Sequence, residues 1–135
     1  MQKPISEIKG ATKAIATALK EQGITNSMQL LDAAKTPKQR KELAGSCGCP
    51  TREILELANR ADLARLKGIG VVYSDLLEHA GVDTVKELRH RRPDNLHAKI
   101  LEVNEAQNLT KQPPPLTTVE DWVAQAKELE PVIEY

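Results

Sequence analysis

Apolar residues recur along this chain at the three- and four-residue spacing of α-helices, with little of the alternation that marks strands. The pattern is clearest in two stretches, which hold Ile54, Leu57, Ala58 and Ala61 with Leu55 and Leu63 nearby, and Val119, Trp122, Val123 and Ala126. Side chains at i, i+3, i+4 and i+7 share one face of a helix. We therefore expect an all-α fold in which both apolar stripes are buried.

Residues that start and stop helices divide the chain into short segments. Thr and Ser favour helix N-caps, proline favours the first helical turn, and glycine favours the position after a helix. On this basis we predict helices over 12–22, over 27–34 with Ser27 as cap, from Pro37, and over 51–66 with Thr51 as cap. In the second half we predict a helix over 71–80, one to about residue 91 with Thr84 as cap, one from Pro93 to about residue 108, and a last helix capped by Thr118.

An internal repeat relates the two halves. A shift of 58 residues places Ile8, Lys9 and Gly10 on Leu66, Lys67 and Gly68, and pairs Leu19 with Leu77, Gly23 with Gly81, Ile24 with Val82 and Leu30 with Leu88. A shift of 66 residues overlays 54–63 on 120–129. We predict two tandem repeats of four or five short helices, 1–64 and 65–135, packed as one compact unit.

Composition and charge narrow the class of protein. The chain has 135 residues, three aromatic side chains and no net charge, which excludes a large catalytic fold. The balance hides an asymmetry, because residues 1–65 hold eleven Lys and Arg against seven Asp and Glu, whereas 66–135 hold eight against twelve. No apolar run is long enough to span a bilayer and the first residues lack a secretion signal, so we expect a cytoplasmic protein with no membrane partner.

One glycine turn forms a recognisable motif. In residues 66–88, LKGIGVVYSDLLEHAGVDTVKEL, a predicted helix ends, Gly68-Ile69-Gly70 turns the chain, and a second helix begins at Val71. The turn resembles helix-hairpin-helix domains such as the C-terminal domain of the alpha chain of RNA polymerase and the N-terminal domain of RecA-type recombinases. With the NRADL-LKGIG junction and the closing VEDWVAQAKEL, the chain resembles an uncharacterised prokaryotic helix-hairpin-helix family of unknown function.

The resemblance implies a contact with nucleic acid as one function of the turn. In DNA-binding hairpins the amides of the Gly-hydrophobic-Gly turn meet phosphate, which here assigns that role to Gly68, Ile69 and Gly70, with charge from Lys67, Lys9 and Lys13. Val71 and Val72 stand where such hairpins carry Lys or Arg, and the first repeat has Gly10-Ala11-Thr12 in place of a second glycine. If Gly70 has a positive φ, Gly70→Ala would destabilise the fold by about 1 kcal/mol or more.

Two basic clusters lie at similar places in the two repeats, and each can be interpreted as a phosphate-binding surface or as a solvated helix end. They comprise Lys35, Lys38, Arg40 and Lys41, and Arg89, His90, Arg91 and Arg92. Interleaved acidic residues and the absence of aromatic stacking platforms favour solvated helix ends over a phosphate-binding surface.

The remaining chemistry-bearing residues do not form an enzyme or metal motif. Cys47 and Cys49 lack the CxxC spacing of zinc sites, and the three histidines are not placed to complete one. No nucleophile elbow or phosphate-binding loop occurs, so we expect no catalysis, no cofactor and no metal. We expect a non-catalytic interaction or scaffolding module that binds a protein partner or itself, and the alternative is sequence-nonspecific binding of a nucleic-acid backbone.

Overall fold

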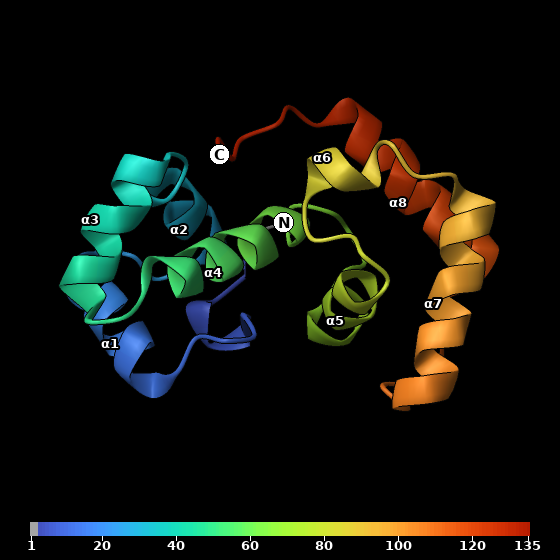
Figure 1. The fold of residues 1–135 in the computed structure, drawn as a ribbon, viewed down its shortest axis with the longest axis horizontal. Helices are drawn as coiled ribbons and strands as arrows, with labels where there is room; N and C mark the ends of the chain where they lie inside the picture. Colours follow the sequence, from blue (N-terminus) through green and yellow to red (C-terminus); the bar gives the residue numbers. More distant parts are fainter. Residues whose placement is uncertain (1–2) are drawn as a thin grey trace. The chain divides into compact units, whose positions relative to one another are not determined.

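The structure is a computed structural model that describes residues 3–135, and this part of the chain is helical without any strand (Figure 1). A 3-10 helix, η1, spans Ile5–Glu7 and is followed by eight α-helices. They are α1 (Lys13–Glu21), α2 (Ser27–Ala33), α3 (Pro37–Cys47), α4 (Thr51–Leu63), α5 (Val71–His79), α6 (Val85–Leu88), α7 (Pro93–Gln107) and α8 (Leu116–Glu128). The predicted all-α class is confirmed. None of these helices is long and apolar enough to cross a bilayer.

The helices form two compact units. The first unit runs to Arg65 and also includes Val132–Tyr135, and the second unit is Leu66–Pro131. The first therefore holds η1 and α1–α4, and the second holds α5–α8. The predicted tandem repeats and their shared core stay predictions.

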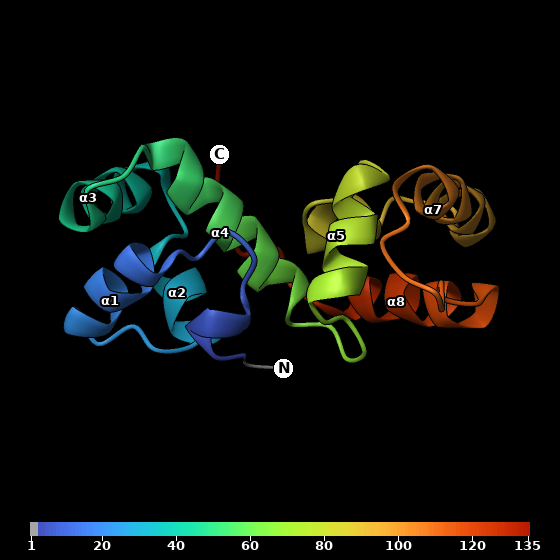
Figure 2. The ribbon, with the colours of Figure 1, turned by 90° about the horizontal axis from the view of Figure 1, so that it is seen from below.

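In the first unit, α4 packs against α2 and α3, and α1 packs against α3 (Figure 2). The apolar stripe of α4 that the sequence predicted, Ile54, Leu57, Ala58 and Ala61, is buried as expected. It meets Leu19 of α1 and the two leucines Leu30 and Leu31 of α2 in one hydrophobic cluster. The core of this unit is built from small aliphatic side chains without an aromatic ring.

In the second unit, α8 packs against α6 and α7, and α5 packs against α7. The predicted stripe of α8, Val119, Trp122, Val123 and Ala126, is buried. Trp122 is 1 % exposed, and its ring lies 5.3 Å from that of Tyr73 in a tilted arrangement. Aromatic pairs prefer such tilted geometry, so the single tryptophan anchors α5 on α8.

Several helix starts differ from the sequence prediction. Asn26, not Ser27, caps α2, because the Asn26 side chain accepts from the Gln29 amide at 2.9 Å while the Ser27 hydroxyl accepts from the Lys3 amide at 2.8 Å. Residues 50 and 115 are prolines and serve as the N-caps of α4 and α8, so Thr51 is helical and α8 begins before Thr118. Proline fixes its own φ near the helical value and can start a helix without a capping side chain.

Two helices end three residues earlier than the sequence predicts, and the other predicted ends lie within one residue of the observed ones. Helix α4 stops at Leu63 instead of 66, and α6 ends at Leu88 instead of 91. After Leu63 the Arg65 amide donates to the Asp62 carbonyl, and after Leu88 the Arg91 amide donates to the Leu88 carbonyl. Both are tightened i to i+3 bonds, which commonly close the last turn of a helix.

The two units share local geometry at their glycines. Gly10 and Gly68 have φ values of 96° and 88°, and Gly23 and Gly81 have values of 81° and 93°. After these last two glycines the next amide reaches back to a leucine carbonyl, from Ile24 to Leu19 at 2.9 Å and from Val82 to Leu77 at 2.8 Å. Helix α1 and helix α5 thus end in the same left-handed turn.

The last four residues, Val132–Tyr135, extend along the first unit, and we call them the strap. Ile133 is buried in the core of the first unit and Val132 packs against that core. No periodicity in the sequence marks this segment, because it is extended and Ile133 is its one buried side chain. Sequence reasoning therefore missed it.

Candidate functional site

The glycine turn predicted from the sequence occupies residues 66–70 of the second unit. Leu66 and Ile69 are buried and hold the turn on the unit, whereas Lys67, Gly68 and Gly70 are exposed. Gly68 carries the left-handed φ of 88°. Glycine has no Cβ and adopts a left-handed conformation at little energetic cost, so it suits this position.

Helix α8 supports the turn through one glutamine. The Gln125 side-chain carbonyl accepts from the Lys67 amide at 2.9 Å, and its Nε2 donates to the Lys67 carbonyl at 3.2 Å. The same Nε2 lies 2.8 Å from an Asp121 carboxylate oxygen. Because Gln125 occupies both backbone groups of Lys67, the turn is held in one geometry and has a carboxylate nearby.

Gly70 does not have the positive φ on which its predicted destabilisation by alanine depends. Gly70 has φ −100° and ψ −164°, which is extended backbone open to any residue, and a Cβ there would meet nothing within 4 Å. The destabilisation by Gly70→Ala that a positive φ would cause is therefore not expected. The left-handed residue of this turn is Gly68, where a Cβ would lie 3.5 Å from Nε1 of Trp122.

We expect Gly68→Ala to lower the free energy of unfolding by about 1 kcal/mol, because alanine is disfavoured at positive φ. Gly70→Ala should change it by no more than about 0.5 kcal/mol. Urea denaturation followed by circular dichroism measures both variants. Equal destabilisation by the two would contradict this geometry of the turn.

The first turn of α5 is open. Gly70 is its N-cap and has no side chain that could accept a hydrogen bond from the first amides of the helix. Within residues 3–135, Thr or Asn side chains cap α1, α2, α3 and α6, whereas α4, α7 and α8 share with α5 the absence of a capping side-chain hydrogen bond and have a proline at the N-cap or in the first turn. Uncapped amides at a helix start can receive an acceptor from outside the chain.

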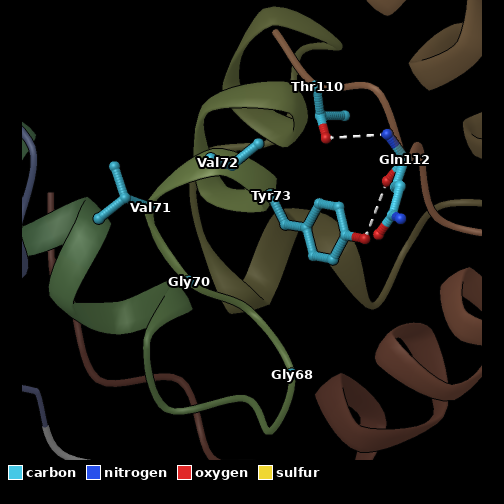
Figure 3. A pocket seen from close by; sticks show the side chains of 7 residues that line it. All are labelled: Gly68, Gly70, Val71, Val72, Tyr73, Thr110 and Gln112. Atoms are coloured by element: carbon cyan, nitrogen blue, oxygen red, sulfur yellow. Dashed lines mark hydrogen bonds between the residues drawn. The ribbon is translucent and has the colours of Figure 1, made fainter.

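Two valines stand exposed at this helix start. Val71 is 43 % exposed and Val72 is 45 % exposed. They line an open pocket of about 360 Å³ with Gly68, Gly70, Tyr73, Thr110 and Gln112, which we call the hairpin face (Figure 3). In Figure 3 the Tyr73 ring points toward Gln112 and Val71 points away from it. No Lys, Arg, Asp or Glu lines this pocket.

The far wall of the pocket is a braced loop. Asn104 exchanges two hydrogen bonds with the backbone of Thr110, both of 3.0 Å, and the Gln112 amide donates to the Thr110 hydroxyl at 3.1 Å. The Tyr73 hydroxyl donates to the Gln112 carbonyl at 3.0 Å and ties the loop to α5. The walls of the pocket are thus held in place by hydrogen bonds within the second unit.

The six residues proposed for phosphate contact fall into two groups. Lys67, Gly68, Ile69 and Gly70 share the turn of the second unit. Lys9 and Lys13 are exposed on the first unit, around the turn where the Thr12 side chain accepts from the Ile15 amide and caps α1. The turn of the first unit is therefore closed by its own threonine, whereas that of the second is open.

The two basic clusters do not consist only of solvated side chains, as the sequence had predicted. Arg40 is only 4 % exposed, so its placement on a solvated helix end was wrong. Its guanidinium donates to backbone carbonyls, including that of Ala34 at 3.0 Å. Arg91 pairs with Glu87 at 3.0 Å and donates to the Gly81 carbonyl at 3.1 Å. Both arginines form hydrogen bonds within the fold, and the sequence alone did not predict these contacts.

The two cysteines are free thiols. Partial burial raises the pKa of Cys47, with a further rise from Cys49, and partial burial also raises the pKa of Cys49, with a further rise from Glu53. A raised pKa keeps a thiol protonated and weakens it as a nucleophile. Over residues 3–135, no group of three or more His, Cys, Asp or Glu side chains is placed to hold a metal ion.

A model of a known protein family matches most of the chain. The family model described as "Domain of unknown function (DUF4332)" matches residues 9–129, which include both glycine turns and end before the strap. Neither a curated protein nor a solved structure matches the chain. Because the family model covers most of the sequence, the chain belongs to the DUF4332 family.

Proposed function

We propose that this protein is a non-catalytic binding module that engages a protein partner through the hairpin face. The observation that carries the proposal is the pair of exposed valines beside an uncharged, braced pocket. Exposed apolar residues gathered around a preformed hollow mark interaction sites. The uncapped amides at the start of α5 are hydrogen-bond donors at the edge of the same surface. They can donate to a backbone carbonyl or a carboxylate of the partner.

The charges around the turn favour a protein over a phosphate backbone. Val71 and Val72 stand where a phosphate-binding hairpin would carry cations, and the turn has Asp121 close to its supporting Gln125. Phosphate binding depends on several Lys or Arg contacts, and a neighbouring carboxylate opposes it. Apolar contact, by contrast, gains from desolvating the two valines.

The repeat prediction fits this proposal. We propose that the two units are a tandem duplication of one helix-hairpin-helix element, supported by the matched φ values of their glycines and the matched leucine-directed amides. On this proposal the first copy closed its turn with Thr12, and the second kept an open turn for binding. A cytoplasmic location suits the two free thiols.

Affinity capture from lysate tests the proposal. The tagged chain should retain a stoichiometric protein after nuclease treatment, and Val71→Ser with Val72→Ser should lose that protein while keeping the helical circular dichroism spectrum. The two serines remove the apolar surface and leave the backbone of α5 unchanged.

Met28→Ser provides the matched control, because Met28 is 43 % exposed but lies on α2 of the first unit. It should capture the same protein as the wild type. Capture of nucleic acid alone, or equal loss of the partner in both variants, would contradict a site on the hairpin face.

Sequence-nonspecific nucleic-acid binding is the second candidate. It is favoured by the uncapped first turn of α5, next to exposed Lys67, because helix N-terminal amides bind phosphate. In this alternative the exposed Lys9 and Lys13 of the first unit add charge. The measurement that closes the Discussion separates the two candidates.

A further inference from the structure

The strap is held on the first unit by hydrogen bonds to its backbone. The Glu134 amide donates to the Lys35 carbonyl at 2.8 Å, and the Glu134 carbonyl accepts from Nη2 of Arg40 at 2.6 Å. The Tyr135 hydroxyl donates to Oδ1 of Asn59 at 3.2 Å. Pairing of both backbone groups of one residue is how grooves hold an extended peptide.

The surface of the first unit that contacts the strap is centred on Arg40, and we call this surface the Arg40 groove. Its Nη1 donates to the carbonyls of Ala34 and Lys35 at 3.0 and 2.9 Å, and its Nη2 is directed at the strap. The guanidinium carbon lies 5.9 Å from the centre of the Tyr135 ring. A charged group that is only 4 % exposed requires acceptors for its donors, and the strap supplies the one for Nη2.

The side chains of the strap divide between core and solvent. Ile133 inserts into the hydrophobic cluster of the first unit, whereas the Glu134 side chain is exposed. Tyr135 is 66 % exposed, so it covers Arg40 without being enclosed. The strap is thus held by the buried Ile133, by Val132 packed against the core, by the backbone of Glu134 and by the ring of Tyr135 over Arg40.

The strap follows three residues without regular structure. Helix α8 ends at Glu128, and Leu129–Pro131 are not helical. Pro131 precedes the strap and is exposed. A segment attached through such a connection can be exchanged between identical chains with all of its contacts preserved, so only the local concentration distinguishes the two arrangements.

We propose that this groove is a peptide-docking site that can take the strap of a second copy of the chain. The surface belongs to the first unit and is separate from the hairpin face, so the inference goes beyond the proposed function. Self-association by strap exchange would then hold two copies together through Arg40, Lys35 and Asn59 of one and Ile133 and Tyr135 of the other.

Mixing two full-length variants tests the proposal. Ile133→Asp spoils the strap and keeps the Arg40 groove, whereas Arg40→Gln spoils the groove and keeps the strap. Each variant alone should sediment as a monomer, and an equimolar mixture should contain a one-to-one dimer. A mixture that stays monomeric, with both variants folded by circular dichroism, would overturn the proposal.

A labelled peptide of residues 129–135, LEPVIEY, gives an independent readout by fluorescence anisotropy. It should bind the Ile133→Asp chain at least about tenfold more tightly than the wild type, whose own strap competes. Glu134→Pro removes the amide that donates to Lys35 without altering the core, and that chain should behave like Ile133→Asp. The same peptide carrying Ile133→Asp should not bind.

The two chain variants guard against a simple loss of folding. If Ile133→Asp unfolds the first unit, binding of the LEPVIEY peptide is measured with the Glu134→Pro chain instead. Failure of LEPVIEY to bind a folded Glu134→Pro chain would show that the strap is a permanent part of the first unit. Either result leaves partner capture at the hairpin face unchanged, so failure of this inference is distinct from failure of the proposed function.

Discussion

Trp122→Ala is expected to lower the free energy of unfolding of the second unit by about 3–5 kcal/mol, the usual cost of removing a large buried aromatic side chain. Trp122 is 1 % exposed, lies against the ring of Tyr73, and would be 3.5 Å from a Cβ at Gly68. Its removal leaves a cavity between α5, α8 and the glycine turn. The hairpin face would lose its support together with its stability.

Urea denaturation followed by far-ultraviolet circular dichroism measures this effect, since the variant has no tryptophan fluorescence. Leu116→Ala is the control on the same helix, because Leu116 is 38 % exposed, and it should cost no more than about 0.5 kcal/mol. A loss below about 1 kcal/mol for Trp122→Ala would contradict a core centred on this ring.

Much of the helical framework follows from local chemistry. Pro37 and Pro93 open α3 and α7 as predicted, and Thr12 and Thr84 cap α1 and α6. These signals act within one helical turn, so a single sequence contains all the information they need. The buried stripes of α4 and α8 were predicted for the same reason, since their periodicity is local.

Features that depend on distant partners could not be predicted. Arg40 sits in a cluster of lysines in the sequence, yet its acceptors include the carbonyl of Glu134, 94 residues away. Gln125 shows no signal in the sequence and nevertheless fixes the turn at Lys67, 58 residues away. Charge and propensity describe what a side chain prefers, whereas only the tertiary fold determines which carbonyl it reaches.

The conformation of the glycine turn shows the same limit. The sequence placed both Gly68 and Gly70 in a tight turn but could not say which has the left-handed φ. That choice depends on the buried Leu66 and Ile69, which fix the path of the chain. The exposure of Val71 and Val72 was likewise not predicted, because valine is among the residue types that are most often buried.

Val71→Lys with Val72→Lys is expected to weaken binding of the captured protein partner by about 30-fold, which corresponds to about 2 kcal/mol of lost apolar contact. The same two lysines place cations where phosphate-binding hairpins have them. The variant therefore changes the two candidate functions in opposite directions. Lys67→Glu is its companion, because it removes the exposed cation of the turn, should change stability by about 0.5 kcal/mol or less, and should not affect partner binding.

Fluorescence anisotropy of a labelled DNA duplex and of the labelled partner, titrated with the wild type and both variants at low salt, tests the central claim that the hairpin face binds protein. We predict that the wild type binds the partner and shows no measurable DNA binding at about 50 mM salt, and that the double lysine variant loses the partner. The contrary result is wild-type DNA binding that falls about 10³-fold between 50 and 200 mM salt, weakens at least tenfold further in Lys67→Glu, and strengthens in the double lysine variant.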